Sequence, residues 1–172
     1  QGVTIQKSFI HSQEGNLRRR RKRKGSARSN RDAPGKVVMI LTVDSRQKTE
    51  MIDITERVQR RLSDAGVDAG FCMVFVPHTT AGVTINENAD PSVREDILRV
   101  LNEIVPWDAD YRHMEGNSPA HVKATVIGAS EMVAVENGKL VLGRWQGIFF
   151  CEFDGPRPRK VHLRFFGESR DG

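Results

Sequence analysis

The sequence predicts an α+β fold in which helices pack on a largely antiparallel sheet within a single compact domain. Its length of 172 residues is about that of one domain. Strand-like apolar runs outnumber helical patterns, and short turn sequences typical of antiparallel hairpins join several of these runs. The sequence shows no internal repeat.

Charge divides the chain near residue 35. Residues 1–35 hold ten Lys and Arg and two acidic residues, whereas residues 36–172 hold 17 basic and 20 acidic ones. The first part is poor in large apolar residues, so we expect a basic, mostly disordered extension over residues 1–35, with TIQKSFI as a short strand or docking segment. The folded domain is expected over residues 36–172.

Apolar periodicity predicts the first elements of the domain. KVVMILTVD, residues 36–44, has the composition of a strand. The next pattern repeats apolar residues every four positions, which predicts a helix that is capped by Asp53 or Thr55 and ends at Gly66. GFCMVFVPHTTAGVTINEN then predicts two strands with His78 at their junction.

The ends of a second helix are also recognisable. Asp90 is a preferred N-cap residue, Pro91 suits the first helical position, and the pattern stops at Pro106. DYRHMEGNSPAHVK then predicts an irregular loop, and HVKATVIGAS fits either a helix or a strand.

The C-terminal part predicts strands. Asn137 and Gly138 form the type I′ turn of a hairpin, and two further strands flank a Gly-Pro-Arg-Pro turn. Cys72 and Cys151 lie inside apolar runs, which favours buried free thiols over a disulfide. No apolar stretch reaches the roughly 18 residues that a membrane helix needs, and no secretory segment is recognisable, so we expect a cytoplasmic protein without a membrane span.

Three histidines are candidate metal ligands. His162 alternates with inward apolar residues and is expected on the surface, whereas His78, His113 and His121 lie at element ends or in a polar loop. Three imidazoles can hold a metal ion and leave a fourth position open, and such ligands favour Zn²⁺, Ni²⁺ or Fe²⁺ over Mg²⁺. The alternative is that these are unrelated loop histidines or hydrogen-bonded core histidines.

Two further groups could carry chemistry. Asn86, Asn88 and Asp90 share one face of an extended backbone near a helix N-terminus that suits an anion; alternatively, Asp90 is only a cap. Glu152 ends an apolar row, so it needs a partner, either Arg157 or Arg159 or a bound ligand. Its pKa could be raised into the range useful for acid or base catalysis.

Three segments carry a family resemblance. VFVPHTTAGVTINENADPSV, YRHMEGNSPAHVKA and LGRWQGIFFCEFDGPRPRKV resemble successive blocks of the YjbQ-like family, whose members are described as secondary thiamine-phosphate synthase enzymes. The resemblance covers about residues 36–167. The basic extension departs from it, because family members begin near residue 36.

The resemblance implies a YjbQ-like fold, a homotrimer with sites near subunit interfaces, and a set of functional positions. The implied metal ligands are His78, His113 and His121. The implied catalytic residues are Glu152, Asn88 and Asp90. The implied substrate-binding residues are Thr79, Asn86, Asn117, Trp145 and Gln146.

The function expected from the resemblance is a metal-dependent enzyme with weak thiamine-phosphate synthase activity, which joins hydroxymethylpyrimidine pyrophosphate to thiazole phosphate. Histidine ligands suit zinc chemistry better than the Mg²⁺ usual for pyrophosphate loss, so the main reaction is expected to be a metal-assisted hydrolysis or another transfer on a small phosphorylated or heterocyclic substrate.

Two alternatives come from other classes. RRRRKRK, within residues 16–31, could bind nucleic acid through phosphates in a salt-dependent way, could be a nuclear-localisation signal, or could be a solvated tail. The same histidines would also suit a non-catalytic carrier of a metal or ligand.

Overall fold

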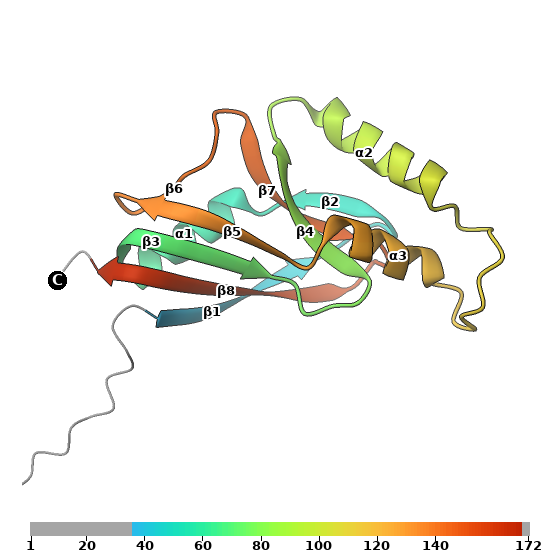
Figure 1. The fold of residues 1–172 in the computed structure, drawn as a ribbon, viewed down its shortest axis with the longest axis horizontal. Coiled ribbons are helices and arrows are strands. Elements are labelled where there is room, and N and C mark those ends of the chain that lie inside the picture. Colours follow the sequence, from blue (N-terminus) through green and yellow to red (C-terminus); the bar gives the residue numbers. More distant parts are fainter. Residues whose placement is uncertain (1–35, 170–172) are drawn as a thin grey trace, which may run out of the picture. The chain divides into compact units, whose positions relative to one another are not determined.

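Two antiparallel β-sheets and three α-helices make up the part of the chain that the structure describes, residues 36–169 of a computed structural model (Figure 1). The predicted α+β class is confirmed. In chain order the elements are β1 (Lys36–Asp44), β2 (Glu50–Asp53), α1 (Thr55–Ala65), β3 (Val67–Phe75), β4 (Ala81–Glu87), α2 (Pro91–Ile104), α3 (Ser118–Ile127), β5 (Ser130–Glu136), β6 (Lys139–Leu140), β7 (Gln146–Glu152) and β8 (Pro158–Ser169).

The strands form two separate sheets. Sheet A has the order β1-β8-β3-β5-β6, and sheet B has the order β2-β7-β4. All of the strand pairings within the described residues are antiparallel. β7 is therefore the central strand of sheet B, with a neighbour on each side.

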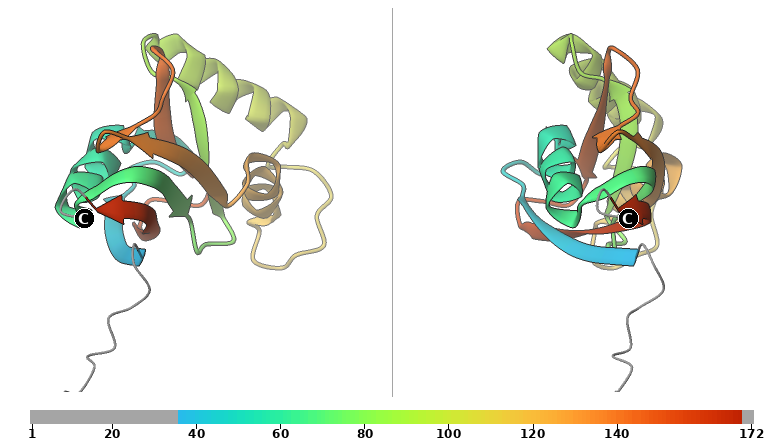
Figure 2. Two further views of the ribbon diagram at one scale, coloured as in Figure 1. Left: turned by 60° about the vertical axis from the view of Figure 1, so that its left-hand side comes forward. Right: turned by 90° about the vertical axis from the view of Figure 1, so that its left-hand side faces the viewer.

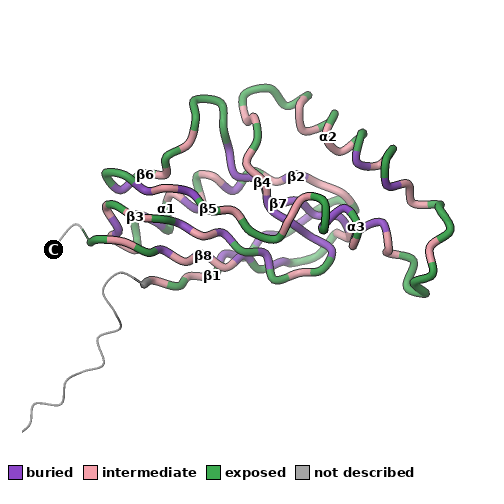
Figure 3. Tube along the Cα trace, viewed as in Figure 1, coloured by how far each residue is buried: buried purple, intermediate pink, exposed green. Residues whose placement is uncertain are grey.

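β7 also separates two hydrophobic cores. Ile148 and Phe150 point into the inter-sheet core, which lies between sheets A and B and includes the buried face of α1. Phe149 and Cys151 point the other way, into the helix core between sheet B and helices α2 and α3. Figure 2 shows α2 and α3 beside the strands of sheet B, and most of β7 is coloured as buried in Figure 3. Because successive side chains of a strand alternate between faces, a strand between two cores needs an uninterrupted apolar run such as IFFC.

α2 begins with the predicted cap, whereas the N-cap position of α1 is held by Ile54, without a side-chain cap, and not by Asp53 or Thr55 as predicted. At α1, Asp53 Oδ1 accepts hydrogen bonds from the N–H and the hydroxyl of Thr55, and Gly66 ends the helix with a left-handed φ of 67°. At α2, Asp90 accepts a hydrogen bond from the Ser92 N–H at 2.9 Å. Both predicted helices are confirmed.

The C-terminal strands and the cysteines also match the prediction. Asn137 and Gly138 have φ angles of 52° and 67°, as a type I′ turn requires, and they join β5 to β6. Cys72 and Cys151 are both free and buried, one in each core.

The polar stretch before β5 differs from the expectation. The irregular loop ends at Asn117, and Ser118 and Pro119 begin α3, so His121 lies on a helix. Proline is favoured in the first turn of a helix, as at Pro91, and this signal also explains the start of α3. The sequence pattern likewise does not separate β2, because its four residues run directly into α1.

Within residues 36–169, no helix is long and apolar enough to cross a membrane. The expected N-terminal extension, with TIQKSFI and the basic run, lies outside the described residues.

Candidate functional site

Three histidines lie near the end of sheet B where Ala81 pairs with Glu152. His78 is in the loop between β3 and β4, His113 is in the loop between α2 and α3, and His121 is in the second turn of α3. α3 packs against β4, which brings the helix beside the His78 loop.

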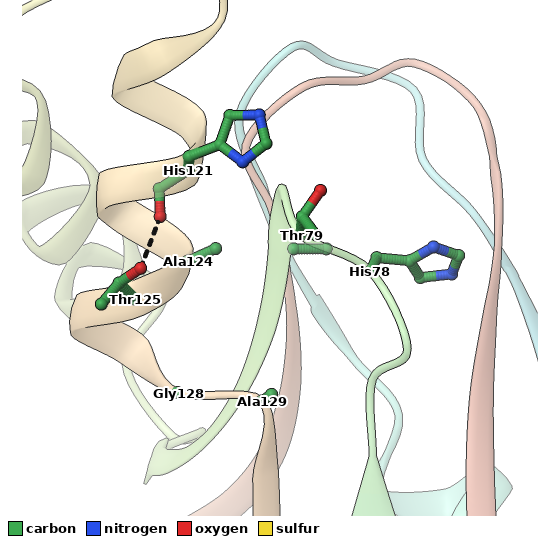
Figure 4. A pocket seen from close by; sticks show the side chains of 8 residues that line it. His78, Thr79, His121, Ala124, Thr125, Gly128 and Ala129 are labelled. Atoms are coloured by element: carbon green, nitrogen blue, oxygen red, sulfur yellow. Dashed lines mark hydrogen bonds between the residues drawn. The ribbon is translucent and has the colours of Figure 1, made fainter.

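A cleft of about 370 Å³ separates α3 from the His78 loop (Figure 4). We call it the histidine cleft. Figure 4 shows His78 and His121 on opposite walls, with Thr79 between them and the His78 ring directed away from α3. Its lining residues are His78, Thr79, Ala81, His121, Ala124, Thr125, Gly128 and Ala129. The two imidazoles therefore border one cleft without touching.

The hydrogen bonding of His78 defines its protonation. Its Nε2 accepts a hydrogen bond from the Lys160 backbone N–H at 2.9 Å. Burial, assisted by the nearby charge of Arg159, lowers the pKa of His78 below its ordinary value. The ring is therefore neutral at pH 7, and its proton is on Nδ1, because Nε2 must keep its lone pair for Lys160.

His113 and His121 form a pair. Their ring centroids are 5.5 Å apart with an angle of 83° between the planes, and His113 Nε2 lies 3.6 Å from a carboxylate oxygen of Glu115. A second hollow of about 390 Å³ opens beside this pair, also bordered by Tyr111, Ser118 and Val122. His121 therefore lines both hollows.

The three histidines do not form one metal site within a single chain. Among residues 36–169, no group of three or more His, Cys, Asp or Glu side chains is arranged to hold a metal ion. His78 in addition has no lone pair to offer, since Nε2 is engaged and Nδ1 carries the proton. The expected three-histidine set thus does not fit a metal ion in this arrangement, and His113 and His121 remain as two adjacent imidazoles.

Glu152 is fully buried and completely hydrogen-bonded. Arg159 donates to both carboxylate oxygens, at 2.7 Å from Nε and 2.5 Å from Nη2. The Ser45 hydroxyl and the backbone N–H groups of Phe153 and Asp154 donate three more hydrogen bonds. The sequence analysis gave Arg157 and Arg159 as alternative partners of Glu152, and in the structure the partner is Arg159. Arg159 also donates to the Thr80 hydroxyl, which ties this pair to the His78 loop.

Asn86, Asn88 and Asp90 lie at the opposite end of β4. Asp90 is exposed and caps α2, and the hydrogen bond from the Ser92 N–H lowers the pKa of Asp90. The Asn88 side chain donates to Asp53 at 2.7 Å. Asn86 is exposed near the end of the strand. These groups are therefore not brought together with the histidines.

The remaining predicted residues lie at one or the other end of sheet B. Trp145 is 56% exposed beside Arg144, and Gln146 accepts a hydrogen bond from the Gly143 N–H, both near Asn88. Asn117 lies at the histidine end, where it donates to Asp154 at 3.2 Å. Its Oδ1 is buried and has no hydrogen-bond partner within residues 36–169.

Sequence reasoning missed one buried cluster. Lys123 is fully buried, donates to Asn102 Oδ1 at 2.5 Å, and lies 4.6 Å from the ring centroid of Trp107, which Lys48 also contacts. Burial, followed by the charge of Lys48, lowers the pKa of Lys123. No motif marked this lysine, because its helix lacks a clear apolar stripe.

The comparisons with known proteins agree with this architecture. A family model described as "UPF0047 protein YjbQ-like" matches residues 39–168. UPF0047 protein YugU of Bacillus subtilis is 52% identical over 128 residues, which cover 74% of this chain and 97% of that protein. A UPF0047 protein of Methanocaldococcus jannaschii is 43% identical over 134 residues, or 78% of this chain and 97% of that protein.

Solved structures give the same result. An uncharacterised conserved protein of the YjbQ/UPF0047 family from Clostridium acetobutylicum is 50% identical, with a TM-score of 0.73 over 74% of this chain and 99% of that chain. A YbjQ-like protein of unknown function from Sulfolobus solfataricus is 34% identical, with a TM-score of 0.75 over 77% of this chain and 98% of that chain. The chain therefore belongs to the UPF0047 family of YjbQ-like proteins.

Proposed function

We propose that this protein is an enzyme that acts on a small phosphorylated or heterocyclic substrate in the histidine cleft. One observation carries the proposal: two imidazoles border opposite walls of a single cleft, and one of them is held neutral in a defined tautomer. A volume of about 370 Å³ is within the usual range for small-molecule sites.

The two histidines have different roles in this proposal. His78 donates a hydrogen bond from Nδ1 to an oxygen or nitrogen of the substrate, since its Nε2 is occupied. No backbone group within residues 36–169 is hydrogen-bonded to the ring of His121, which is the group that exchanges a proton with the substrate. Glu152 has a positioning role in this proposal: with Arg159 and Thr80 it holds the loop that carries His78.

The reaction that the family resemblance implies is included as a weak activity. Joining hydroxymethylpyrimidine pyrophosphate to thiazole phosphate releases pyrophosphate, and hydrogen-bond donation to the leaving oxygen is a task that His78 can perform. Thr79 supplies a hydroxyl in the same cleft.

The test uses three alanine variants. His78→Ala and His121→Ala should each lower the rate of thiamine phosphate formation from the two substrates by about 100-fold or more. His162→Ala is the matched control, because His162 lies on the outer side of β8 away from the cleft lining, and it should retain the wild-type rate. Wild-type rates in both cleft variants would refute the proposal.

Metal binding is a separate part of the proposal. As an alternative to proton exchange at His121, we propose that His113 and His121 hold a divalent ion, Zn²⁺ before Ni²⁺ or Fe²⁺. Elemental analysis of the purified protein should find metal that is lost in the His113→Ala/His121→Ala double variant and kept in His162→Ala. Equal metal content in all three proteins would remove the metal from the proposal.

A further inference from the structure

One side of sheet A packs against no helix within residues 36–169. α1 contributes to the inter-sheet core on the other side, and α2 and α3 pack on sheet B (Figure 2). We call the uncovered side the outer face of sheet A. Directly paired residues on neighbouring strands point to the same side of a sheet, so the register gives the rows of side chains on this face. The rows are Phe166-Phe71-Ala134, Val38-Arg164-Met73-Met132, Ile40-His162-Phe75-Ser130 and Thr42-Lys160.

Three phenylalanine rings are exposed on this face. Phe71 is 52% exposed, and Phe75 and Phe166 are each 37% exposed. Phe166 on β8 pairs directly with Phe71 on β3, and Phe75 lies four residues further along β3, a distance of about 13 Å. The side of an antiparallel sheet that faces water is normally polar. Exposed rings on two neighbouring strands instead form a surface on which flat apolar groups can stack.

The two charged residues in these rows are both cations. Lys160 and Arg164 lie on β8 with His162 between them, and neither cation has a side-chain hydrogen bond or ion pair within residues 36–169. Residues 36–172 hold 17 basic and 20 acidic residues, so composition alone does not explain a face without carboxylates. The acidic residues of these four strands all fall outside the rows: Asp44, Asp68, Glu131, Glu136 and Glu168.

We propose that the outer face of sheet A binds single-stranded nucleic acid. Its bases would stack on the three phenylalanine rings, and its phosphates would lie beside the two cations of β8. A sheet surface is open and extended, which suits a chain more than a compact ligand. A duplex carries the same phosphates, but its base faces are already stacked on one another, and a simple anion has no flat apolar group. The single strand alone matches both the rings and the charges.

This face differs from the basic run at residues 18–24. That run has seven consecutive cations and no aromatic residue, so it can neutralise phosphates but cannot stack on bases. The two contributions also differ in their response to salt, because phosphate contacts weaken steeply with added salt. None of the face residues lines the histidine cleft, so the proposal is independent of the proposed function.

The test measures the binding of a fluorescein-labelled oligothymidylate of about 12 nucleotides to the full chain by fluorescence anisotropy. Every protein compared carries glutamine at residues 18–24, so that the basic run does not mask the face. Phe71→Ala should weaken binding by about 10-fold, and Phe71→Ala/Phe166→Ala by about 30-fold or more. Ile104→Ala is the control, because this residue is 63% exposed but lies on α2, and it should bind within about twofold of the parent.

The charges are tested by the dependence of binding on salt. Lys160→Ala/Arg164→Ala should lower the slope of log affinity against log salt concentration by about 1.4, since each phosphate contact to a single strand contributes about 0.7. Arg60→Ala/Arg61→Ala removes two exposed cations from α1 and should leave the slope unchanged. An oligouridylate of the same length shows whether RNA or DNA is preferred, and tight binding of either supports the proposal.

Three results would overturn the proposal. The first is unchanged affinity in Phe71→Ala/Phe166→Ala, when circular dichroism shows that this variant is folded. The second is equal or tighter binding of a duplex of the same length, because its base faces are not available to the rings. The third is a chain that binds no oligonucleotide but has a lower mass by sedimentation in the same double variant, which would assign the face to contacts between proteins.

Discussion

The two ends of sheet B differ in the burial of their polar side chains. At the end where Ala81 pairs with Glu152, a carboxylate is fully buried and receives five hydrogen bonds. At the end where Glu87 pairs with Gln146, the neighbouring polar groups are largely in water, and Asp90 only caps a helix. The six residue steps along β4 separate the two ends by about 20 Å.

The difference shows what burial requires of a polar group. A buried carboxylate is stable only when its oxygens are engaged, and the groups that engage Glu152 come from the β1–β2 loop, the β7–β8 turn and β8. These hydrogen bonds link the β1–β2 loop, the β7–β8 turn and β8 at this end, and Arg159 extends them to Thr80 in the His78 loop. The exposed end has no such requirement, and its hydrogen bonds serve local turns and caps.

The largest effect is expected from breaking the buried pair. Arg159→Leu should lower the free energy of unfolding by about 3–5 kcal/mol, because Glu152 would remain buried without its counter-charge. Arg157→Leu is the control: its pair with Asp154 is half exposed, and its loss should cost less than about 1 kcal/mol. Urea unfolding measures both, and equal losses would contradict the contrast between a buried and an exposed pair.

A smaller effect is expected where Asn88 is tied to α1. Asp53→Ala should cost about 1 kcal/mol, since Asp53 accepts hydrogen bonds from the N–H and hydroxyl of Thr55 and from Asn88. Burial opposes the shift, but hydrogen bonds from Thr55 and Asn88 hold the pKa of Asp53 below 3.8. This contribution is present above pH 3.8 and is lost as the pH falls through the lower folded pKa.

Thermal unfolding between pH 7 and acid should therefore show the wild type losing its advantage over Asp53→Ala below about pH 4. Asp96→Ala, which removes one partner of an exposed pair with Arg99, provides the control. A constant difference between wild type and Asp53→Ala across this range would exclude the role assigned to Asp53.

The smallest effect is expected from the titration of His78. Its folded pKa is lowered mainly by burial, so the unfolded chain takes up a proton at higher pH than the folded one does. Wild-type stability should fall as the pH drops below about 6.5, and His78→Gln, which can still accept from Lys160, should lack this slope. Nitrogen chemical shifts of His78 should also place the proton on Nδ1; a proton on Nε2 would rule out the assigned tautomer.

The elements with clear ends were predictable. α2 has Asp90 and Pro91 at its start and Pro106 beyond its end, and the hairpin has Asn137 and Gly138, so local chemistry defined both. The sequence pattern left helix and strand open for α3. Ala120 and Ala124 are buried on one side of the helix and Val122 and Val126 are exposed on the other, so the sequence has no apolar stripe that marks a helix.

The sequence indicated which residues are candidates for the functional site, but not which of them lie together in the fold. Arg157 and Arg159 have the same parity as Val161 and Leu163, so alternation alone did not separate them as partners of Glu152; Arg159 lies inside β8, whereas Arg157 precedes the strand. The strand predicted after His78 already implied that Asn86 and Asn88 lie far from it, because residues eight or ten apart are distant along a strand. Their grouping with the histidines came from the family resemblance alone. The three predicted metal ligands are not grouped in the described residues, where His78 Nε2 accepts from the Lys160 backbone N–H and His113 pairs with His121.

The position of β7 between two cores gives the chain a pair of internal reporters. Cys72 lies in the inter-sheet core and Cys151 in the helix core, and burial raises the pKa of each thiol to about 12. Neither thiol reacts readily with alkylating reagents while its core is closed. The order in which the two cysteines become labelled under partial denaturation therefore records which layer of the molecule opens first, without any engineered probe.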